Sequence, residues 1–246
     1  MSLLHTSFIE KQAEDFRQQY GYGTDKPINL QSLLLELNVP TFFKPMKSVS
    51  GMAYKSDKND KFILINSAQT VGRQNFTICH ELYHLFVQKD FEYKVCVTQK
   101  FDKKDKHEYY ADLFASFFLL PSKGIRDLVP DDEFEKDSIS LDTVVKIEQA
   151  FQCSRLALLH RLKQLHLISD SKKIEYSTHV KSSAYNRAYP IRLYEKTDSI
   201  DVWGDYGKIA LDLFQNRKIS EGDYTSLMID VGIDVLASQP EELIDF

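Results

Sequence analysis

Five consecutive residues, His80-Glu81-Leu82-Tyr83-His84, constrain this chain more than any other part of its sequence. Side chains four positions apart share one face of an α-helix, so His80 and His84 can present ring nitrogens to one ion only if the segment is helical. Glu81 is rotated by about 100° from His80 but remains its neighbour in space. Apolar residues at helical spacing predict one buried flank, with the histidines at the edge of a cleft. This flank comprises Ile78, Leu82, Leu85 and Phe86.

The spacing of these residues is the H-E-x-x-H pattern of zinc metallopeptidases. In that chemistry the two histidines hold the metal, and Glu81 is the general base that accepts a proton from water and passes it to the leaving amine. The alternative interpretation is two surface histidines on an amphipathic helix. A catalytic zinc needs a third protein ligand and one open position, so the first interpretation requires a further donor elsewhere in the chain.

Glu108 is our candidate for the third ligand, and it opens a second predicted helix. Its carboxylate would complete a set of two histidines and one glutamate. Asp112 lies one turn further on the same face, where it can accept a hydrogen bond from the free ring nitrogen of a ligating histidine. The alternative is that both are solvated acids at a helix start, where the dipole favours them. His107, Tyr109 and Tyr110 are candidates for stabilising an oxyanion, and the sequence does not distinguish among them.

The pattern of the whole chain predicts an α+β fold. Apolar periodicity and capping residues indicate helices over residues 6–20, 30–37, 73–88, 108–120, 141–151, 154–167, 208–216 and 221–229, and short β-type runs cover residues 41–43, 49–55 and 62–65. The strand over residues 49–55 is either a core strand or an edge to which an extended peptide could add. Residues 176–203 are rich in aromatic and β-branched side chains, which favours a β-rich accessory core.

Composition limits the classes of protein that remain. Of 246 residues, 43% are hydrophobic and 27% charged, as in globular proteins. The longest apolar stretch is far shorter than the roughly 20 residues of a membrane span, and we expect no membrane association and no secretory signal. Three widely spaced cysteines form no disulfide framework, which fits a reducing cytoplasm. A net charge of -5 provides no global electrostatic reason to bind nucleic acid.

The two motifs together resemble the ImmA/IrrE family of metallopeptidases. The block Glu108-Tyr109-Tyr110-Ala111-Asp112, continuing to Pro121, is similar to that family's E-x-x-A-[N/D]-x-F-A block, and residues 73–79 resemble its lead-in to H-E-x-x-H. The similarity extends over about residues 27–169. It implies a zincin-like peptidase domain, a small β-sheet packed on an active-site helix, over residues 1–130. A helix-turn-helix-like unit would follow over 131–170, and an accessory or sensor region over 171–246.

The resemblance further implies a cytoplasmic endopeptidase with one Zn²⁺ per chain. Its substrate would be a helix-turn-helix repressor whose removal derepresses stress, mobile-element or defence genes. Two alternatives remain open at this stage. One is a metal-bearing module that sequesters a repressor without cutting it. The other is a DNA-binding regulator that uses the helix pair at 141–167, where Arg155, His160, Arg161 and Lys163 supply basic character. The sequence does not indicate the oligomeric state.

Overall fold

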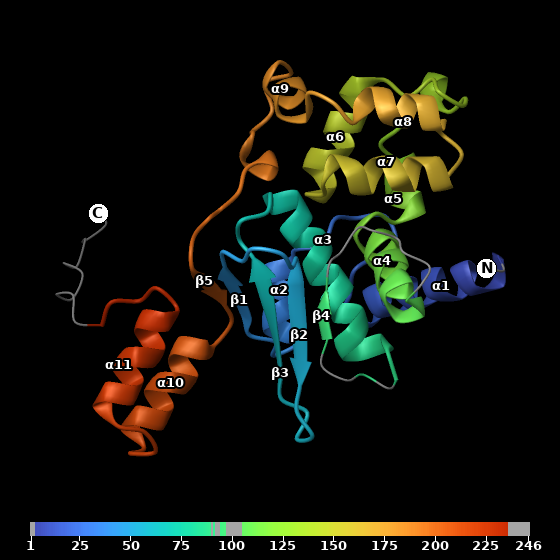
Figure 1. Ribbon diagram of the computed structural model, residues 1–246. Helices are drawn as coiled ribbons and strands as arrows, with labels where there is room; N and C mark the ends of the chain where they lie inside the picture. Colours follow the sequence, from blue (N-terminus) through green and yellow to red (C-terminus); the bar gives the residue numbers. More distant parts are fainter. Residues whose placement is uncertain (1–2, 90, 92–93, 97–104, 236–246) are drawn as a thin grey trace, which may run out of the picture.

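The computed structural model describes residues 3–89, 91, 94–96 and 105–235, and its architecture is a small sheet covered by helices (Figure 1). Among the described residues the sheet has five strands in the order β4-β2-β3-β1-β5. The strands are β1 (Thr41–Lys44), β2 (Gly51–Lys55), β3 (Lys61–Asn66), β4 (Lys94–Cys96) and β5 (Asp201–Trp203). The predicted α+β class is therefore confirmed. The polar stretch at residues 99–106, whose composition predicts a surface loop, lies outside the described residues up to position 104, and so do residues 236–246.

Strand pairing in this sheet is mixed. β1 runs parallel to β3, whereas β2 pairs antiparallel with β3 in the hairpin that the polar turn at 56–60 predicts. β2 also pairs antiparallel with β4, with Gly51 opposite Cys96 and Ala53 opposite Lys94. The idea that β2 is a sheet edge open to a peptide is thus wrong for residues 51–53. Strand β4, which comes about 40 residues later in the chain, pairs with this edge and covers it.

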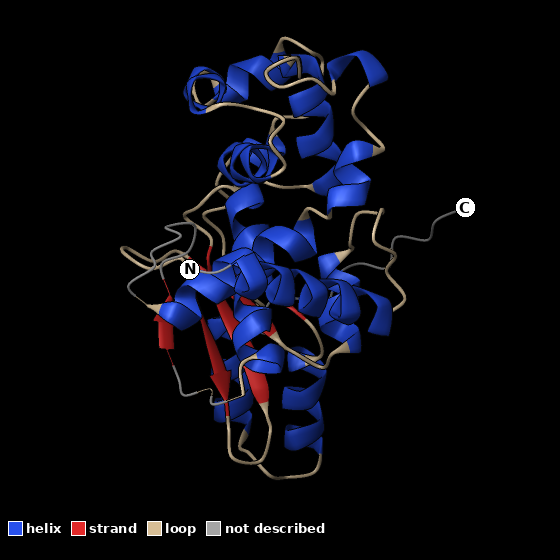
Figure 2. Cartoon of the chain, turned by 90° about the vertical axis from the view of Figure 1, so that its right-hand side faces the viewer, coloured by secondary structure: helices blue, strands red, loops and turns tan. Residues whose placement is uncertain are grey.

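The helices are disposed in three groups. α1 (Leu3–Gln19), α3 (Val71–Leu82) and α4 (Lys106–Leu119) pack together, with α3 lying on β2 and β3. Above them in Figure 1 are α5 (Ser122–Arg126), α6 (Leu141–Phe151), α7 (Arg155–Gln164), α8 (Asp170–Tyr176) and α9 (Val180–Tyr185). α2 (Leu30–Glu36) lies by β5, and α10 (Tyr206–Gln215) pairs with α11 (Glu221–Asp230) as a hairpin. Figure 2 shows from the side how helices pack over the sheet, with strands open at the lower left of the view.

A buried arginine joins α1 to the end of α4. The Arg17 guanidinium is fully buried and donates to the carbonyl oxygens of Gly23 at 2.7 Å, Phe118 at 2.5 Å and Lys26. Burial lowers its pKa to about 10, so it remains charged at neutral pH. Three converging carbonyl dipoles compensate part of the desolvation cost of this charge. The contact fixes the long helix α1 against α4, and α4 in turn carries Glu108.

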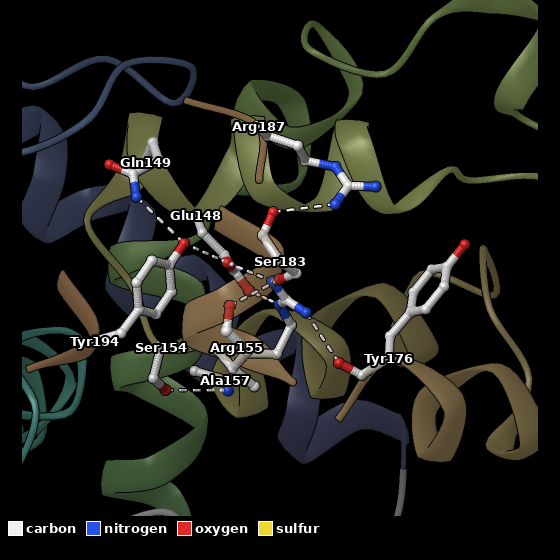
Figure 3. Close-up of polar contacts among 10 residues, drawn as sticks. Glu148, Gln149, Ser154, Arg155, Ala157, Tyr176, Ser183, Arg187 and Tyr194 are labelled. Carbon is white, nitrogen blue, oxygen red and sulfur yellow. Dashed lines mark hydrogen bonds and ion pairs between the residues drawn. The ribbon is translucent and has the colours of Figure 1, made fainter. Parts of the chain in front are cut away.

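The predicted helix pair at 141–167 is present as α6 and α7. Gln152 ends α6 in the left-handed conformation, with φ of 52°, and the Ser154 hydroxyl accepts the Ala157 N–H to cap α7. Figure 3 shows the polar network that fixes the pair: the Arg155 guanidinium contacts both Glu148 carboxylate oxygens and the Ser183 hydroxyl. Arg155 and Glu148 are buried, so this network is internal to the group of helices α5–α9, called the helical unit below.

The predicted β-rich core over residues 176–203 is wrong. This region forms the short helix α9, a 3-10 turn at Arg192–Tyr194 and one three-residue strand, β5, and α8 ends at Tyr176. β5 joins the main sheet beside β1, with Trp203 opposite Thr41. The aromatic residues that suggested strands instead contact the helical unit: the Tyr194 hydroxyl donates to Glu148, and the Tyr176 hydroxyl donates to the Ile139 carbonyl.

Substitution of Gly72 tests the packing of α3 on the α6–α7 turn. A Cβ at this position would lie 2.8 Å from the Cys153 carbonyl carbon and the Ser154 nitrogen. Both are backbone atoms, so the clash can be relieved only by moving the α6–α7 turn or α3. We expect Gly72→Ala to lower the free energy of unfolding by about 1–3 kcal/mol in a denaturant titration. The matched control is Gly222→Ala in α11, where the nearest atom lies 3.8 Å away and alanine should be neutral or stabilising by up to about 1 kcal/mol. The same sign for both variants would contradict the close contact.

Candidate metal centre

Helix α3 carries both histidines of the motif, and its end is unusual. The α-helix stops at Leu82 and continues as a π-helical turn over Tyr83–Val87, in which the Gln88 N–H donates to the Tyr83 carbonyl at 2.9 Å. His80 therefore lies in the α-helical part and His84 in the π-helical turn. Single π-helical turns inside helices occur frequently at functional sites because they re-aim side chains. The predicted helix over residues 73–88 is confirmed in extent but not in type.

Helix α4 brings Glu108 to these histidines across 24 positions of sequence. Asp105 caps α4, its side chain accepting the N–H groups of His107 and Glu108, which places Glu108 in the first turn. α4 packs directly on α3, so the start of one helix lies beside the end of the other. The histidine side chains are 1% and 0% exposed and Glu108 is 20% exposed. The histidines are thus buried, rather than at the edge of a cleft as predicted, and Glu108 is the most exposed of the three.

The donor groups of the three side chains lie close together at the corners of a small triangle. His80 Nε2 lies 3.2 Å from His84 Nε2 and 3.4 Å from one Glu108 oxygen, and His84 Nε2 lies 3.5 Å from the other oxygen. A tetrahedral ion with bonds of about 2.0–2.1 Å holds neighbouring ligand atoms about 3.3–3.4 Å apart. Within the described residues, these three side chains are the group whose donor atoms converge closely enough to hold a metal ion.

Two further side chains orient the imidazoles. Asp112 Oδ1 lies 3.0 Å from His80 Nδ1, the contact proposed from the sequence, and Gln88 Oε1 lies 2.6 Å from His84 Nδ1. Both oxygens are acceptors, so each ring donates from Nδ1 and a neutral ring then carries its lone pair on Nε2. Sequence reasoning missed Gln88. Its position four residues after His84 was the available signal, but an ordinary α-helix gave no reason to single it out.

The electrostatics of this triangle follow from the tautomers. Two imidazole lone pairs and one carboxylate face one another in a largely buried space, where their mutual repulsion is poorly screened. A bound divalent cation, or protons on the rings, compensates this arrangement. The donor set and its spacing therefore fit a divalent metal ion of the kind that imidazole and carboxylate ligands prefer.

Glu81 lies beneath β2. It is fully buried, and the position that a Cβ on Gly51 would occupy is 3.0 Å from Glu81 Oε1 and 2.5 Å from the Thr77 methyl carbon. Any side chain at residue 51 would therefore collide with α3 at this point. The glycine lets the sheet approach the helix at the turn where the motif begins, and it leaves the Glu81 carboxylate directly under the strand.

The other sequence candidates lie around the start of α4. His107 is exposed, Tyr109 is half-buried, and Tyr110 is buried with its ring stacked on His5 of α1 at 6.3 Å between centroids. Because Tyr110 faces α1, it points away from the side of α4 that carries Glu108 and Asp112. The choice among the three as an oxyanion donor stays a prediction. Cys79, the neighbour of His80, is fully buried in the hydrophobic core, and burial raises the pKa of its thiol.

Fold and site together define an α+β protein with a buried His-His-Glu group suited to a divalent metal. Residues 35–163, about half of the chain, match the family model described as Peptidase_M78, IrrE N-terminal-like domain. The chain therefore belongs to this family, and the resemblance to ImmA/IrrE proteins is confirmed.

Two individual proteins give a measure of similarity. Metallopeptidase ImmA of Bacillus subtilis (strain 168) is 36% identical over 86 residues, which cover 34% of this chain and 50% of that protein. The match thus spans about half the length of this relative. A transcriptional regulator of Mycobacterium tuberculosis has a similar solved structure, with 13% identity, a TM-score of 0.40, and coverage of 64% of this chain and 46% of the other. Among the described residues, no helix combines the length and apolar character that a membrane span requires.

Substitution of Asp112 tests the orientation of His80. Asp112→Asn keeps the shape of the side chain but removes the charge that strengthens the donor character at Nδ1 and the basicity at Nε2. We expect the affinity for a divalent metal ion to fall by about 10–100-fold, as judged by competition with a chromophoric chelator. Asp127→Asn is the matched control, because Asp127 contacts Lys123 on the surface. Equal affinities in the two variants would contradict the proposed hydrogen bond to a metal ligand.

Proposed function

We propose that this protein is a zinc-dependent endopeptidase that cleaves a helix-turn-helix repressor. The observation that carries the proposal is the triangle of His80, His84 and Glu108, with the carboxyl group of Glu81 one residue from the first ligand. Membership of the Peptidase_M78 family supports the same chemistry. The match to Metallopeptidase ImmA covers half of that protein, so the activity of the whole chain is part of this proposal.

The choice of zinc follows from the donor set. Two imidazole nitrogens and one carboxylate are the three protein ligands of many catalytic zinc sites, in which the fourth position is taken by water or substrate. The distance of 3.2 Å between the two imidazole nitrogens, and the distances of 3.4 and 3.5 Å from these to the two Glu108 oxygens, are close to the separation of neighbouring ligands around an ion of that size. When bound, zinc supplies Lewis-acid polarisation of a carbonyl group and lowers the pKa of a water molecule to about 7.

The chain's own residues supply the proton transfers. The Glu81 carboxylate takes the proton of the attacking water and then delivers it to the amine that leaves as the peptide bond breaks. Asp112 and Gln88 hold the imidazoles so that their lone pairs stay directed at one point. Burial of Glu81 excludes competing solvent and raises the strength of each electrostatic interaction there.

The proposal that the substrate is a helix-turn-helix repressor rests on the resemblance to the ImmA/IrrE family. Sequestration of a repressor without cleavage is the second candidate, and Glu81 argues against it because metal binding alone needs no glutamate at this position. The DNA-binding alternative has less support from the side chains of α7. Arg155 contacts the buried Glu148, and Arg161 contacts Glu10 and the Leu120 carbonyl, so both guanidinium groups are used inside the protein.

Replacing the proposed general base separates catalysis from metal binding. We expect Glu81→Gln to retain the metal content of the unmodified protein and to lower the cleavage rate by about 10²–10⁴-fold. The measurement follows the disappearance of a purified helix-turn-helix repressor on electrophoresis, with metal per chain determined in the same samples. Repressors encoded near this chain's gene are the first substrates to test. Glu175→Gln, which alters an exposed carboxylate on α8, is the control and should cleave normally.

Two results would contradict parts of the proposal. Undiminished cleavage by Glu81→Gln would remove the assigned base. A stable complex with intact repressor, formed equally by the unmodified protein and by Glu81→Gln, would favour sequestration instead.

Gly51 provides an independent test of the position of Glu81. Gly51→Ala adds a Cβ that must displace the Glu81 carboxylate or the Thr77 methyl group. A displacement of this size should reduce the cleavage rate by about 10–100-fold while leaving the metal content unchanged. Gly207→Ala is the control, since its added Cβ would have an ordinary contact of 3.4 Å with Met228. Equal activities of the two variants would show that Glu81 needs no such clearance.

A further inference from the structure

A second site, distinct from the metal centre, lies where the helical unit meets α2, α3, the end of α4 and strand β5. It is a cavity of about 720 Å³, lined by the segment before α2, the first turns of α3, the end of α6, the residues after α9 and strand β5. Ligand-binding clefts typically measure about 300–1,000 Å³. We propose that this cavity binds a purine nucleotide, held through Arg192, Trp203 and the side-chain amides of Asn75, Gln149 and Gln152.

Arg192 supplies the charge of this cavity. Its side chain is the charged group among the described lining residues. Its guanidinium forms no ion pair or hydrogen bond with the part of the chain that the structure describes, whereas Arg155, Arg161 and Arg187 are all paired. An arginine fork facing a cavity is suited to a phosphate group, which it can bind with two parallel hydrogen bonds.

The amide side chains supply acceptors. Asn75 donates to the Gln152 carbonyl at 2.8 Å, Gln149 donates to the Pro190 carbonyl at 3.0 Å, and Gln152 donates to the Gln149 carbonyl at 2.6 Å. Gln149 uses both N–H groups of its amide, the second toward the Tyr194 hydroxyl, whereas Asn75 and Gln152 each use one of two. The three side-chain oxygens can therefore accept hydrogen bonds from a ligand, and the amides of Asn75 and Gln152 can each also donate one. These side-chain amide oxygens are hydrogen-bond acceptors, so they favour a ligand with N–H donors, such as the amino and ring N–H groups of a purine.

Gln149 is held in place by the network of Figure 3. Its amide nitrogen lies 3.2 Å from the Tyr194 hydroxyl, which donates to Glu148 at 2.7 Å, and Glu148 is paired with Arg155. Burial and the neighbouring Glu148 charge raise the pKa of Tyr194, so its hydroxyl stays protonated and keeps donating. A polar group fixed by its neighbours loses little entropy when a ligand binds.

Trp203 supplies the flat apolar surface. Its ring packs on Phe43 with centroids 4.6 Å apart, and it lines the cavity together with Leu119, Phe151 and Leu193. A planar base gains about 1–3 kcal/mol by stacking on an aromatic side chain. The cavity therefore combines a stacking surface, hydrogen-bond acceptors and one cation, which correspond to the base, the amino groups and the phosphate of a nucleotide.

The cavity does not belong to the peptide-cleaving site. Asn75 precedes His80 by five residues, so it lies about 7.5 Å away along α3 and is rotated by about 140° around the helix axis. Nevertheless both helices that carry metal ligands reach the cavity, α3 through Val71 and Asn75 and α4 through Leu119. The proposal thus goes beyond the peptidase function and does not depend on it.

The experiment uses the single tryptophan of the chain as its reporter. AMP and GMP are titrated separately into the full-length, zinc-loaded protein while Trp203 fluorescence is recorded, and isothermal calorimetry measures the same binding without a chromophore. Adenosine, guanosine and inorganic phosphate are the comparison ligands. The variant is Arg192→Gln, and the control is Arg217→Gln, which alters an exposed arginine in the α10–α11 loop.

We expect saturable binding of at least one nucleotide, and affinity about tenfold or more lower in Arg192→Gln but unchanged in Arg217→Gln. Its nucleoside and inorganic phosphate should each bind at least about tenfold more weakly than that nucleotide. Absence of saturable binding by both methods would overturn the proposal. Equal affinities in Arg192→Gln and the unmodified protein would overturn it as well. Binding of phosphate as tight as that of the nucleotide would overturn the nucleotide assignment.

Discussion

The packing of α3 against α4 determines most of what this protein can do. It forces two imidazole lone pairs and a carboxylate to within 3.2–3.5 Å of one another, in surroundings where His80 and His84 have almost no contact with water. Such convergence is unfavourable for the apoprotein unless a cation or protons compensate it. The rigid parts around the triangle, including the buried Arg17 that fixes α1 on α4, hold together a group of atoms that repel one another.

The sequence allowed prediction of what depends on local spacing. His80 and His84 are four positions apart on a helix, so their convergence follows from helical geometry alone. The proposal of Glu108 required the chemical rule that a catalytic zinc has three protein ligands. Gln88 lies four positions after His84, a spacing that a helix brings to one face, but no rule about metal ligands singles out a glutamine at the end of the predicted helix.

The errors have a common physical origin in short or distant elements. α8 and α9 contain seven and six residues, too few to establish a helical period against the aromatic and β-branched residues around them. β4 contains three residues and pairs with β2 from more than 40 positions away, so nothing local in strand β2 indicates that its edge is covered. Tertiary pairing of this kind is invisible to local sequence preference.

The π-helical turn also makes the second histidine sensitive to the length of its segment. A π-helical turn is equivalent to an α-helix with one residue inserted. Deleting one residue between His84 and Gln88 would turn Gln88 by about 100° around the helix axis and move it out of its present contact with His84. An apolar substitution at Leu85 or Phe86 alters packing alone, whereas a deletion there displaces the hydrogen-bond partner of the His84 ring. A change of length in this stretch therefore affects the metal centre more directly than a change of side chain.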